Sequence, residues 1–446
     1  MVTVTERVAT TSVKAVSFSR HGVMAILAGF VLRLLFLLVT PFHGFDTFAY
    51  RHWTWRLVHE PLGRFYVDDG QAFPDHLPGD LWLLKILGEI TRVFDPSIDY
   101  YSRSYSIAIA CMVMLFDVVA MVSIWHIGTY FSDSDRAFRY ALAYWLAPAP
   151  IFVAAVWGQT DGIAAGLAVT VLALGISGRY PWAMLVLTLV VLIKPQYGLL
   201  AIPLMVSWWH TSDRLWKSWI FQVAGTCAAC LALMVLVCVP FRVSPIGGWG
   251  EWSLIDRVRL ANDLYPVSSL GAHNVWILAN PFSWPPDDRH AWMFGFSRYT
   301  IGIASFSVVV ATTFWILLCR WRGAVTMVLA SNILMLGSFL FLTRMHERYS
   351  FPLAVLSILL ATIDGHYRRY AITMNALIFA NIALRFAWSA AEYRSTGLAH
   401  VFHQVWLIWL LVLITVGAFG WLVWEACRRK EPTQEARWQL PHRSRP

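Results

Sequence analysis

Long apolar runs dominate the pattern of the chain, and short polar stretches separate them. A helix needs roughly 20 apolar residues to cross about 30 Å of hydrocarbon. Runs near this length lie at about 22–41, 105–130, 138–156, 161–176, 299–319, 324–342, 351–363, 371–387 and 404–425. Shorter or interrupted runs lie at about 182–194, 195–209 and 218–240. The pattern therefore predicts an all-α polytopic membrane protein with about 12 transmembrane helices.

Composition and charge agree with this pattern. Of 446 residues, 58% are hydrophobic and 14% are charged, which favours repeated spans over a large soluble core. Lys and Arg gather in alternate connections, namely DSDRAFR, SGRYP, SDRLWKS, CRWRG and GHYRRY. Because such residues favour the cytoplasmic side, we expect a multi-pass cell-membrane protein with both termini in the cytoplasm. The net charge of +9 is then a topology signal rather than a nucleic-acid surface.

The same topology predicts the domain organisation. Residues 1–21 form a cytoplasmic segment, 22–425 the transmembrane domain, and 426–446 a basic, disordered cytoplasmic tail. The first span is expected to stay as an anchor, because TPFHGFD follows it instead of a small-residue cleavage site. Two long outer loops run at about 41–104 and 241–298, and both are expected to carry interfacial helices. In the first, LPGDLWLLKILGEITRVF has apolar residues at helical spacing.

Several polar residues fall on the predicted outer side. Asp46 follows the first span in HGFDTFAY, where it could also be a helix N-cap. Asp75 and His76 come later in the same loop. Gln159 and Asp161 lie in VWGQTDG between two spans, where a simple polar turn is the alternative interpretation. Because all of these residues fall on the predicted outer side of the membrane, we expect them to converge there.

Two further stretches place charge at membrane depth or close to it. Lys194 lies between two short apolar runs, and Pro195 interrupts any continuous helix. Irregular backbone at that depth needs protein or a watery cavity around it, although a snorkelling lysine is the alternative. RMHERYSFP places Arg344, Glu347 and Arg348 between two apolar runs. Such charges are costly and predict a functional site, with an ion-paired turn as the structural alternative.

The motifs of the sequence assign no function to several other polar or reactive residues. Arg33 and Asp117 lie inside the first two spans, where they either neutralise each other or contact a substrate. The six cysteines lie in or beside apolar runs, and their spacing gives no disulfide framework.

Six motifs in sequence carry a resemblance to a known family: GFDTFAY, FPDHLPGDLWLL, VWGQTDGI, IKPQYGLL, SSLGAHNVWIL and RMHERYSFP. Together they resemble the multispanning GT-C class of glycosyltransferases that use polyprenyl-phosphate-linked sugars. Within that class the chain is most similar to bacterial proteins related to the second GPI mannosyltransferase, over roughly residues 25 to 360. It departs from the family at Gly271, His273 and Asp80. These departures put the sugar or acceptor specificity in doubt.

The resemblance implies a function and a set of site residues. A single sugar, expected to be mannose, would pass with inversion from a polyprenyl phosphate to a glycan, glycolipid or protein acceptor on the outer face. Asp46 would be the catalytic base. The donor phosphate would be held by Lys194, Arg344, His346 and Arg348. Other substrate contacts are expected from Asp75, His76, Gln159, Asp161, Gln196, Asn274, Trp276 and Glu347. Fixed cations can match a monophosphate leaving group, so neither a metal nor another cofactor is expected.

Two other classes stay open at this point. Intramembrane charges also mark the pathways of transporters and flippases for lipid-linked glycans. A lipid-linked glycan polymerase or ligase would share the lipid phosphate. The two halves of the chain lack a matching pair of Gly/Pro-broken spans, and the long aromatic outer loops favour an external active site.

Overall fold

A computed structural model describes residues 20–39, 45–67, 70, 72–98, 103–212, 216–247, 252–280, 286–321, 323–393 and 404–429. Most of the predicted N-terminal segment and tail lies outside these residues. The longer helices are α2 (Arg20–Val39), α3 (Phe45–His59), α4 (Pro78–Phe94), α5 (Arg103–Phe131), α6 (Ser134–Trp145), α8 (Asp161–Ile176), α9 (Tyr180–Ile193), α10 (Ala201–Thr211), α11 (Trp216–Cys238), α12 (Leu254–Asp263), α13 (Arg298–Cys319), α14 (Ala324–Phe341), α15 (Pro352–Ile363), α16 (Arg368–Tyr393) and α18 (Val405–Arg428).

Short elements join these helices. The helical turns are η1 (Leu62–Arg64), α7 (Pro148–Ile151), the π-helical η2 (Phe152–Trp157), η3 (Pro195–Leu200), η4 (Val239–Phe241), η5 (Val275–Leu278), η6 (Glu347–Ser350) and η7 (Gly365–Tyr367). Strands occur only in the predicted second outer loop, among the residues that the structure describes. They are β1 (Val243–Ser244) parallel to β2 (Trp252–Ser253), and β3 (Ala291–Met293) antiparallel to β4 (Phe296–Ser297).

Each of the twelve apolar runs coincides with a helix. Seven helices in the described part of the chain are long and apolar enough to span a membrane, and α6 with α7 and η2 forms an eighth candidate bent by 45°. The apolar helices α8 and α9 are shorter, at 16 and 14 residues. The apolar helices therefore show an all-α multi-pass membrane protein. The count of about 12 crossings stays a prediction.

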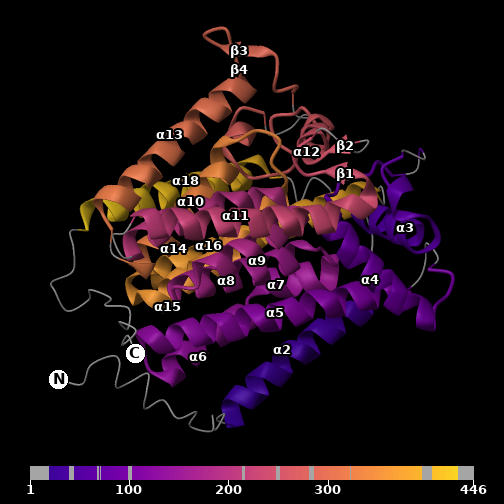
Figure 1. Ribbon diagram of the computed structural model, residues 1–446, viewed down its shortest axis with the longest axis horizontal. Helices are drawn as coiled ribbons and strands as arrows, with labels where there is room; N and C mark the ends of the chain where they lie inside the picture. The colour runs from indigo at the N-terminus through magenta and orange to yellow at the C-terminus, as the bar shows by residue number, and fades with distance from the viewer. Residues whose placement is uncertain are drawn as a thin grey trace.

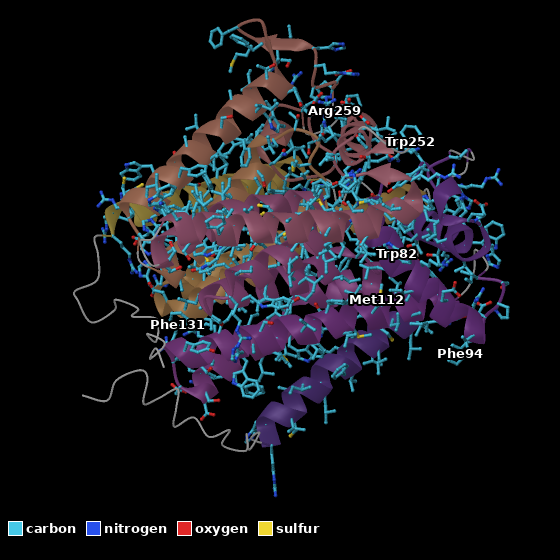
Figure 2. All side chains as sticks on the ribbon, viewed as in Figure 1. Trp82, Phe94, Met112, Phe131, Trp252 and Arg259 are labelled. Carbon is cyan, nitrogen blue, oxygen red and sulfur yellow. The ribbon has the colours of Figure 1, made fainter. Side chains whose placement is uncertain are left out.

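Burial separates an inner group of helices from an outer one. All residues of α15 are buried, and so are 83% of the residues of α14. A helix that is apolar all round belongs inside a bundle, and the side chains in Figure 2 fill the space between the ribbons. In contrast, only 22%, 11% and 28% of the residues are buried in the 18-residue apolar stretches of α2, α11 and α13. In Figure 1, α2 lies along the lower edge and α13 at the upper left, and all three helices leave apolar side chains exposed.

The predicted cytoplasmic connections meet at one end of the bundle. Arg429 pairs with Asp364 at 2.7 Å, which joins the tail to GHYRRY. Gly365 packs so closely on Arg136 that a Cβ there would lie 2.5 Å from Nη2. In Figure 1 the end of α18 lies at the left, while α3, α4 and α12 lie at the right. The tail, GHYRRY and DSDRAFR therefore lie at one end of the bundle. Which side of the membrane this end faces stays a prediction.

Cysteine labelling tests that orientation. Ser97 is exposed near α4, and Ser177 is exposed in the turn between α8 and α9 at the opposite end. In a background without the six native cysteines, we expect Cys at Ser97 to react with an impermeant thiol reagent in intact cells. Cys at Ser177 should react only after permeabilisation, because positive loops stay in the cytoplasm. The reversed pattern would contradict the predicted orientation.

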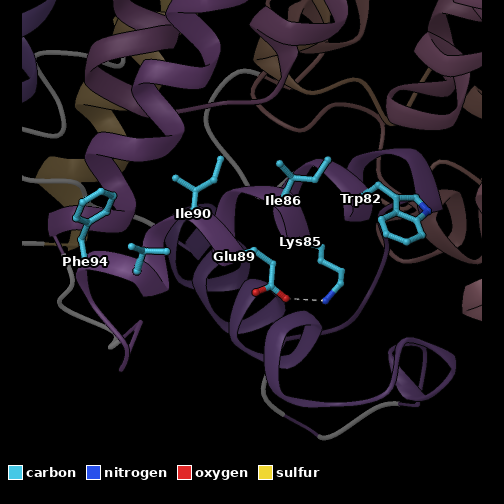
Figure 3. A pocket seen from close by; sticks show the side chains of 7 residues that line it. Trp82, Lys85, Ile86, Glu89, Ile90 and Phe94 are labelled. Atoms are coloured by element: carbon cyan, nitrogen blue, oxygen red, sulfur yellow. Dashed lines mark hydrogen bonds and ion pairs between the residues drawn. The ribbon is translucent and has the colours of Figure 1, made fainter.

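The predicted interfacial helix of the first outer loop is present as α4. Its buried face carries Leu81, Leu84 and Leu87. The opposite face exposes apolar side chains that line a shallow groove of about 450 Å³, shown in Figure 3, in which Lys85 pairs with Glu89 at 3.0 Å. The exposed apolar members are Ile86, Ile90, Val93 and Phe94. The helix prediction is confirmed, and its place at the membrane surface stays a prediction.

Arg33 and Asp117 neutralise each other, which was one of the two interpretations of the sequence. Arg33 Nη2 lies 3.0 Å from Asp117 Oδ2, and neither side chain is exposed. Arg33 also donates to the carbonyl of Trp145 at 2.8 Å, and Tyr144 donates to Asp117 at 2.8 Å. These contacts satisfy a charge pair that would otherwise be costly inside the bundle, because an unpartnered buried charge strongly destabilises a fold.

Candidate active site

A cavity of about 540 Å³ lies where the two predicted outer loops and the RMHERYSFP motif meet. Its polar lining contains many of the residues predicted from sequence: Asp75, His76, Lys194, Gln196, Arg344, His346 and Arg348. Its apolar lining includes Ile193, Leu199, Val258, Phe306 and Leu342. The cavity therefore offers charge and apolar surface to one ligand.

The cavity is recessed relative to the ends of the long spans. Asp161 begins α8 and Lys194 directly follows α9, so both lie at the same end of this helical hairpin. Helices of 16 and 14 residues measure only about 24 Å and 21 Å, against about 30 Å of hydrocarbon. If the hairpin turn lies at one membrane surface, its charged end lies about 6–9 Å inside the other.

The short loop before α8 organises the site. Gly158 ends η2 in the left-handed region at φ 71°, which glycine adopts without a steric penalty. The turn sends three consecutive side chains to three different groups: Gln159 to Asp46, Thr160 to Asp80, and Asp161 to Lys194 and Arg348. A polar turn was the alternative interpretation of this loop, and the turn instead joins the parts of the site.

Asp46 lies in the first turn of α3 and faces the other site residues. Gln159 Nε2 donates to its Oδ2 at 2.8 Å, and Tyr50 fixes that amide by donating to Gln159 Oε1 at 2.8 Å. Arg348 Nη1 lies 3.3 Å from the same Oδ2. Burial acts to raise the pKa of Asp46, but the Arg348 guanidinium, together with the other basic groups around this carboxylate, holds that pKa below its ordinary value. Asp46 is therefore an ionised carboxylate at neutral pH.

Arg348 is a buried guanidinium that three carboxylates share. Beside Asp46, it lies 3.4 Å from Glu347 Oε1 and 3.7 Å from Asp161 Oδ2. Its Nε makes no hydrogen bond to any described residue. None of these contacts is the parallel two-bond pairing that guanidinium groups form with carboxylates. Arg348 therefore keeps donor capacity for an anionic ligand.

Lys194 and His346 complete the inner part of the site. Lys194 Nζ lies 3.6 Å from Asp161 Oδ2. This carboxylate compensates the charge of an ammonium that is buried in the protein. For His346, burial and the charge of Arg348 hold the pKa well below its usual value. His346 is thus a neutral imidazole, able to donate one hydrogen bond and accept another.

Arg344 has partners of its own beside the cavity. Its Nε and Nη2 pair with Asp288 at 2.8 and 3.1 Å, and its Nη1 pairs with Asp263 at 2.7 Å. Asp288 is fully buried and also accepts from Thr343 at 2.6 Å. These bonds tie the second outer loop to the RMHERYSFP motif. The structure thus places the guanidinium in a structural anchor, and phosphate binding by Arg344 stays a prediction.

Asn274 and Trp276 lie apart from the cavity lining. Asn274 Nδ2 donates to the carbonyl of Phe339 at 3.3 Å, and Trp276 Nε1 donates to that of Phe341 at 2.9 Å. Both bonds satisfy backbone oxygens at the end of α14, which helices leave without internal partners. Their predicted substrate contacts stay untested, and their observed contacts are structural.

The structure adds three residues that the sequence did not assign to the site: Tyr50, Asp80 and Thr160. Asp80 is fully buried and accepts from His76 Nδ1 and, at 3.5 Å, from Thr160. Burial acts to raise the pKa of Asp80, but His76, together with Lys194 and Thr160, lowers that pKa. The spacing of His76 and Asp80, four residues apart at the start of a helix, was the signal available in the sequence.

Comparison with known proteins gives no assignment for this arrangement. No protein-family model matches the chain, and no curated protein matches it either. The function is therefore argued from the geometry of the site and from the motifs that form it.

Proposed function

We propose that this chain is an integral-membrane glycosyltransferase. It transfers one sugar, expected to be mannose, from a polyprenyl phosphate to an acceptor hydroxyl in the recessed cavity. One observation carries the proposal: the carboxylate of Asp46 and the cations Arg348 and Lys194 come from three distant segments and meet beside one cavity. A base next to paired cations suits a reaction that removes a proton and releases a phosphate.

The proposed reaction is a single displacement. Asp46 takes the proton of the acceptor hydroxyl while that oxygen forms a bond to the anomeric carbon. The bond from this carbon to the phosphate oxygen breaks, and the electron pair leaves with the polyprenyl phosphate. Arg348 and Lys194 stabilise the negative charge that grows on the phosphate. Attack opposite the leaving group inverts the anomeric centre.

Donor binding would also prepare the base. The guanidinium of Arg348 lies 3.3 Å from Asp46 and lowers its pKa. A phosphate that draws Arg348 away would weaken this contact, and Asp46 would become a stronger base. Proton transfer is then favoured only when the donor is in place.

The apolar side of the cavity supports a lipid-linked donor. Phe306 lies on α13 and Leu342 directly after α14, whereas Ile193 and Leu199 flank Lys194 on α9 and η3. A phosphate held 6–9 Å or so below the membrane surface leaves its prenyl chain in hydrocarbon, which suits the depth of the α8–α9 hairpin. A soluble nucleotide sugar would gain nothing from such a recess.

Sugar transfer in vitro tests the proposal. We expect purified protein in detergent to move radiolabelled mannose from a polyprenyl phosphate to a component of a membrane extract. The Asp46→Asn protein, purified in the same way, is the matched control and should transfer almost none. Absence of transfer to any component by folded wild-type protein would overturn the proposal. Movement of the intact labelled lipid across vesicles without transfer would favour a flippase instead.

A further inference from the structure

A second polar cluster lies on the cavity wall beside Asp46. It consists of His76, which lines the cavity, and Asp80, which is completely buried behind it. Asp80 Oδ2 accepts from His76 Nδ1, and Asp80 Oδ1 makes no hydrogen bond within the described part of the chain. An ionised carboxylate only accepts hydrogen bonds, so the imidazole nitrogen that faces it must carry a proton. Asp80 therefore fixes which nitrogen of His76 is protonated.

Close packing holds this pair in place. A Cβ on Gly79 would lie 2.7 Å from the backbone of Leu192, so the start of α4 sits directly on α9. The ring of Trp53 packs on His76 with centroids 4.8 Å apart, and that of Tyr50 packs edge-on at 5.3 Å. The imidazole is thus held by two rings and by a carboxylate. It has little freedom to turn.

The remaining nitrogen of His76 is available to a ligand. Nε2 lies on the far side of the ring from Asp80, 4.0 Å from Asp75 Oδ1, and Asp75 also lines the cavity. In the form of the ring that carries its single proton on Nδ1, Nε2 accepts a hydrogen bond. Tyr50 links the imidazole to the catalytic side of the cavity, because its ring packs against His76 and its hydroxyl fixes Gln159 against Asp46.

We propose that Asp80 is a positioning residue that presents Nε2 of His76 to a carbohydrate hydroxyl bound in the cavity. The nature of this ligand rests on the proposed glycosyltransferase function. The hydroxyl could belong to the sugar of the donor or to a sugar of the acceptor, since both offer the same O–H donor. The contact would orient that sugar relative to Asp46.

Two measurements on Asp80→Asn test the inference. Asparagine keeps the size of the side chain but can offer an N–H to His76, which removes the preference for a proton on Nδ1. In ¹⁵N-histidine NMR spectra, with the His76 signals identified by their loss in His76→Gln, we expect the Nδ1–H form in the wild type and its loss in Asp80→Asn. The KM of one substrate should rise about fivefold to tenfold, the scale of one hydrogen bond, with a smaller change in kcat.

The two substrates separate the possible sources of the hydroxyl. A higher KM for polyprenyl-phosphate mannose assigns the contact to the donor sugar, and a higher KM for the acceptor assigns it to the acceptor. His76→Gln should raise the same KM, which keeps the test valid if Asp80→Asn fails to fold. Glu89→Gln, on the exposed face of the same helix, is the matched control and should change neither KM. Unchanged KM values with an unchanged Nδ1–H signal would overturn the inference.

Failure of the proposed function would be visible separately. If the wild type transfers no sugar, binding of polyprenyl-phosphate mannose is compared with binding of polyprenyl phosphate alone. The inference then predicts tighter binding of the sugar-bearing lipid by about fivefold to tenfold, lost in Asp80→Asn. Equal binding of the two lipids by the wild type would exclude the donor sugar, and equal binding of a mannoside acceptor by the wild type and Asp80→Asn would then overturn the inference.

Discussion

Replacing Asp46 by Asn is expected to lower turnover by about 100-fold or more while donor binding persists. Asparagine has nearly the same shape and keeps an oxygen for Gln159, which donates to Asp46 at 2.8 Å. It cannot take a proton from an acceptor hydroxyl. The measurement is sugar transfer from a polyprenyl phosphate under saturating donor, together with the dissociation constant of the donor and the thermal midpoint of each protein.

The control for this substitution lies at the end of the same helix. Glu60 pairs with Arg56 at 3.1 Å and is partly exposed, so Glu60→Gln removes a carboxylate from α3's surface without touching the cavity. It should leave turnover unchanged. Near-normal turnover of Asp46→Asn would move the base to Asp161 or Asp75. A large fall in its thermal midpoint would instead indicate that Asp46 mainly stabilises the start of α3.

Replacing Arg348 by Gln is expected to weaken transition-state stabilisation by about 2–4 kcal/mol, the scale of one lost preorganised charge contact. Arg348→Lys should restore only part of the rate, because an ammonium cannot hold two phosphate oxygens with a fixed planar fork. The pH dependence should change as well. Arg348 lowers the pKa of Asp46 and burial acts to raise it, so the acid limb of kcat/KM should move to higher pH in Arg348→Gln.

The acid limb of the wild-type kcat/KM profile is the reference for the shift expected in Arg348→Gln. Because the pKa of Asp46 is below its ordinary value, the wild-type acid limb should lie below the pH range in which an ordinary aspartate titrates. The control is the double variant Glu347→Gln with Arg348→Gln. If Arg348 only neutralised Glu347, removal of both would recover activity, and such recovery would contradict the phosphate-binding role. An acid limb that does not move would contradict the coupling to Asp46.

The sequence was sufficient for the helices and for the meeting of the main charges. Apolar runs become helices because the membrane leaves the backbone no other partners. Counting those runs put Asp46, Asp161, Lys194 and Arg348 on one side. In the structure these four form a chain of contacts, from Lys194 through Asp161 and Arg348 to Asp46. Their convergence follows from topology, which depends on the order of the runs and not on the details of packing.

The order of the apolar runs does not predict the contacts that depend on how the outer loops fold. Arg344 was predicted to bind phosphate because it shares a motif with Arg348, yet its guanidinium lies between Asp263 and Asp288. Those partners are 81 and 56 residues away in a loop with little regular structure. The four-residue spacing of His76 and Asp80 can be seen in the sequence. The burial of Asp80, however, depends on how α4 packs on α9.

The loop of Gln159, Thr160 and Asp161 limits how this protein can change during evolution. Each of these neighbours serves a different part of the site, through Asp46, Asp80 and the pair of cations. One inserted or deleted residue would displace all three side chains together, so the loop has a fixed length even though it is a turn. Compensating substitutions would have to arise on three other segments at once. Asp46, the two cations and the His76–Asp80 pair are therefore coupled through one short loop.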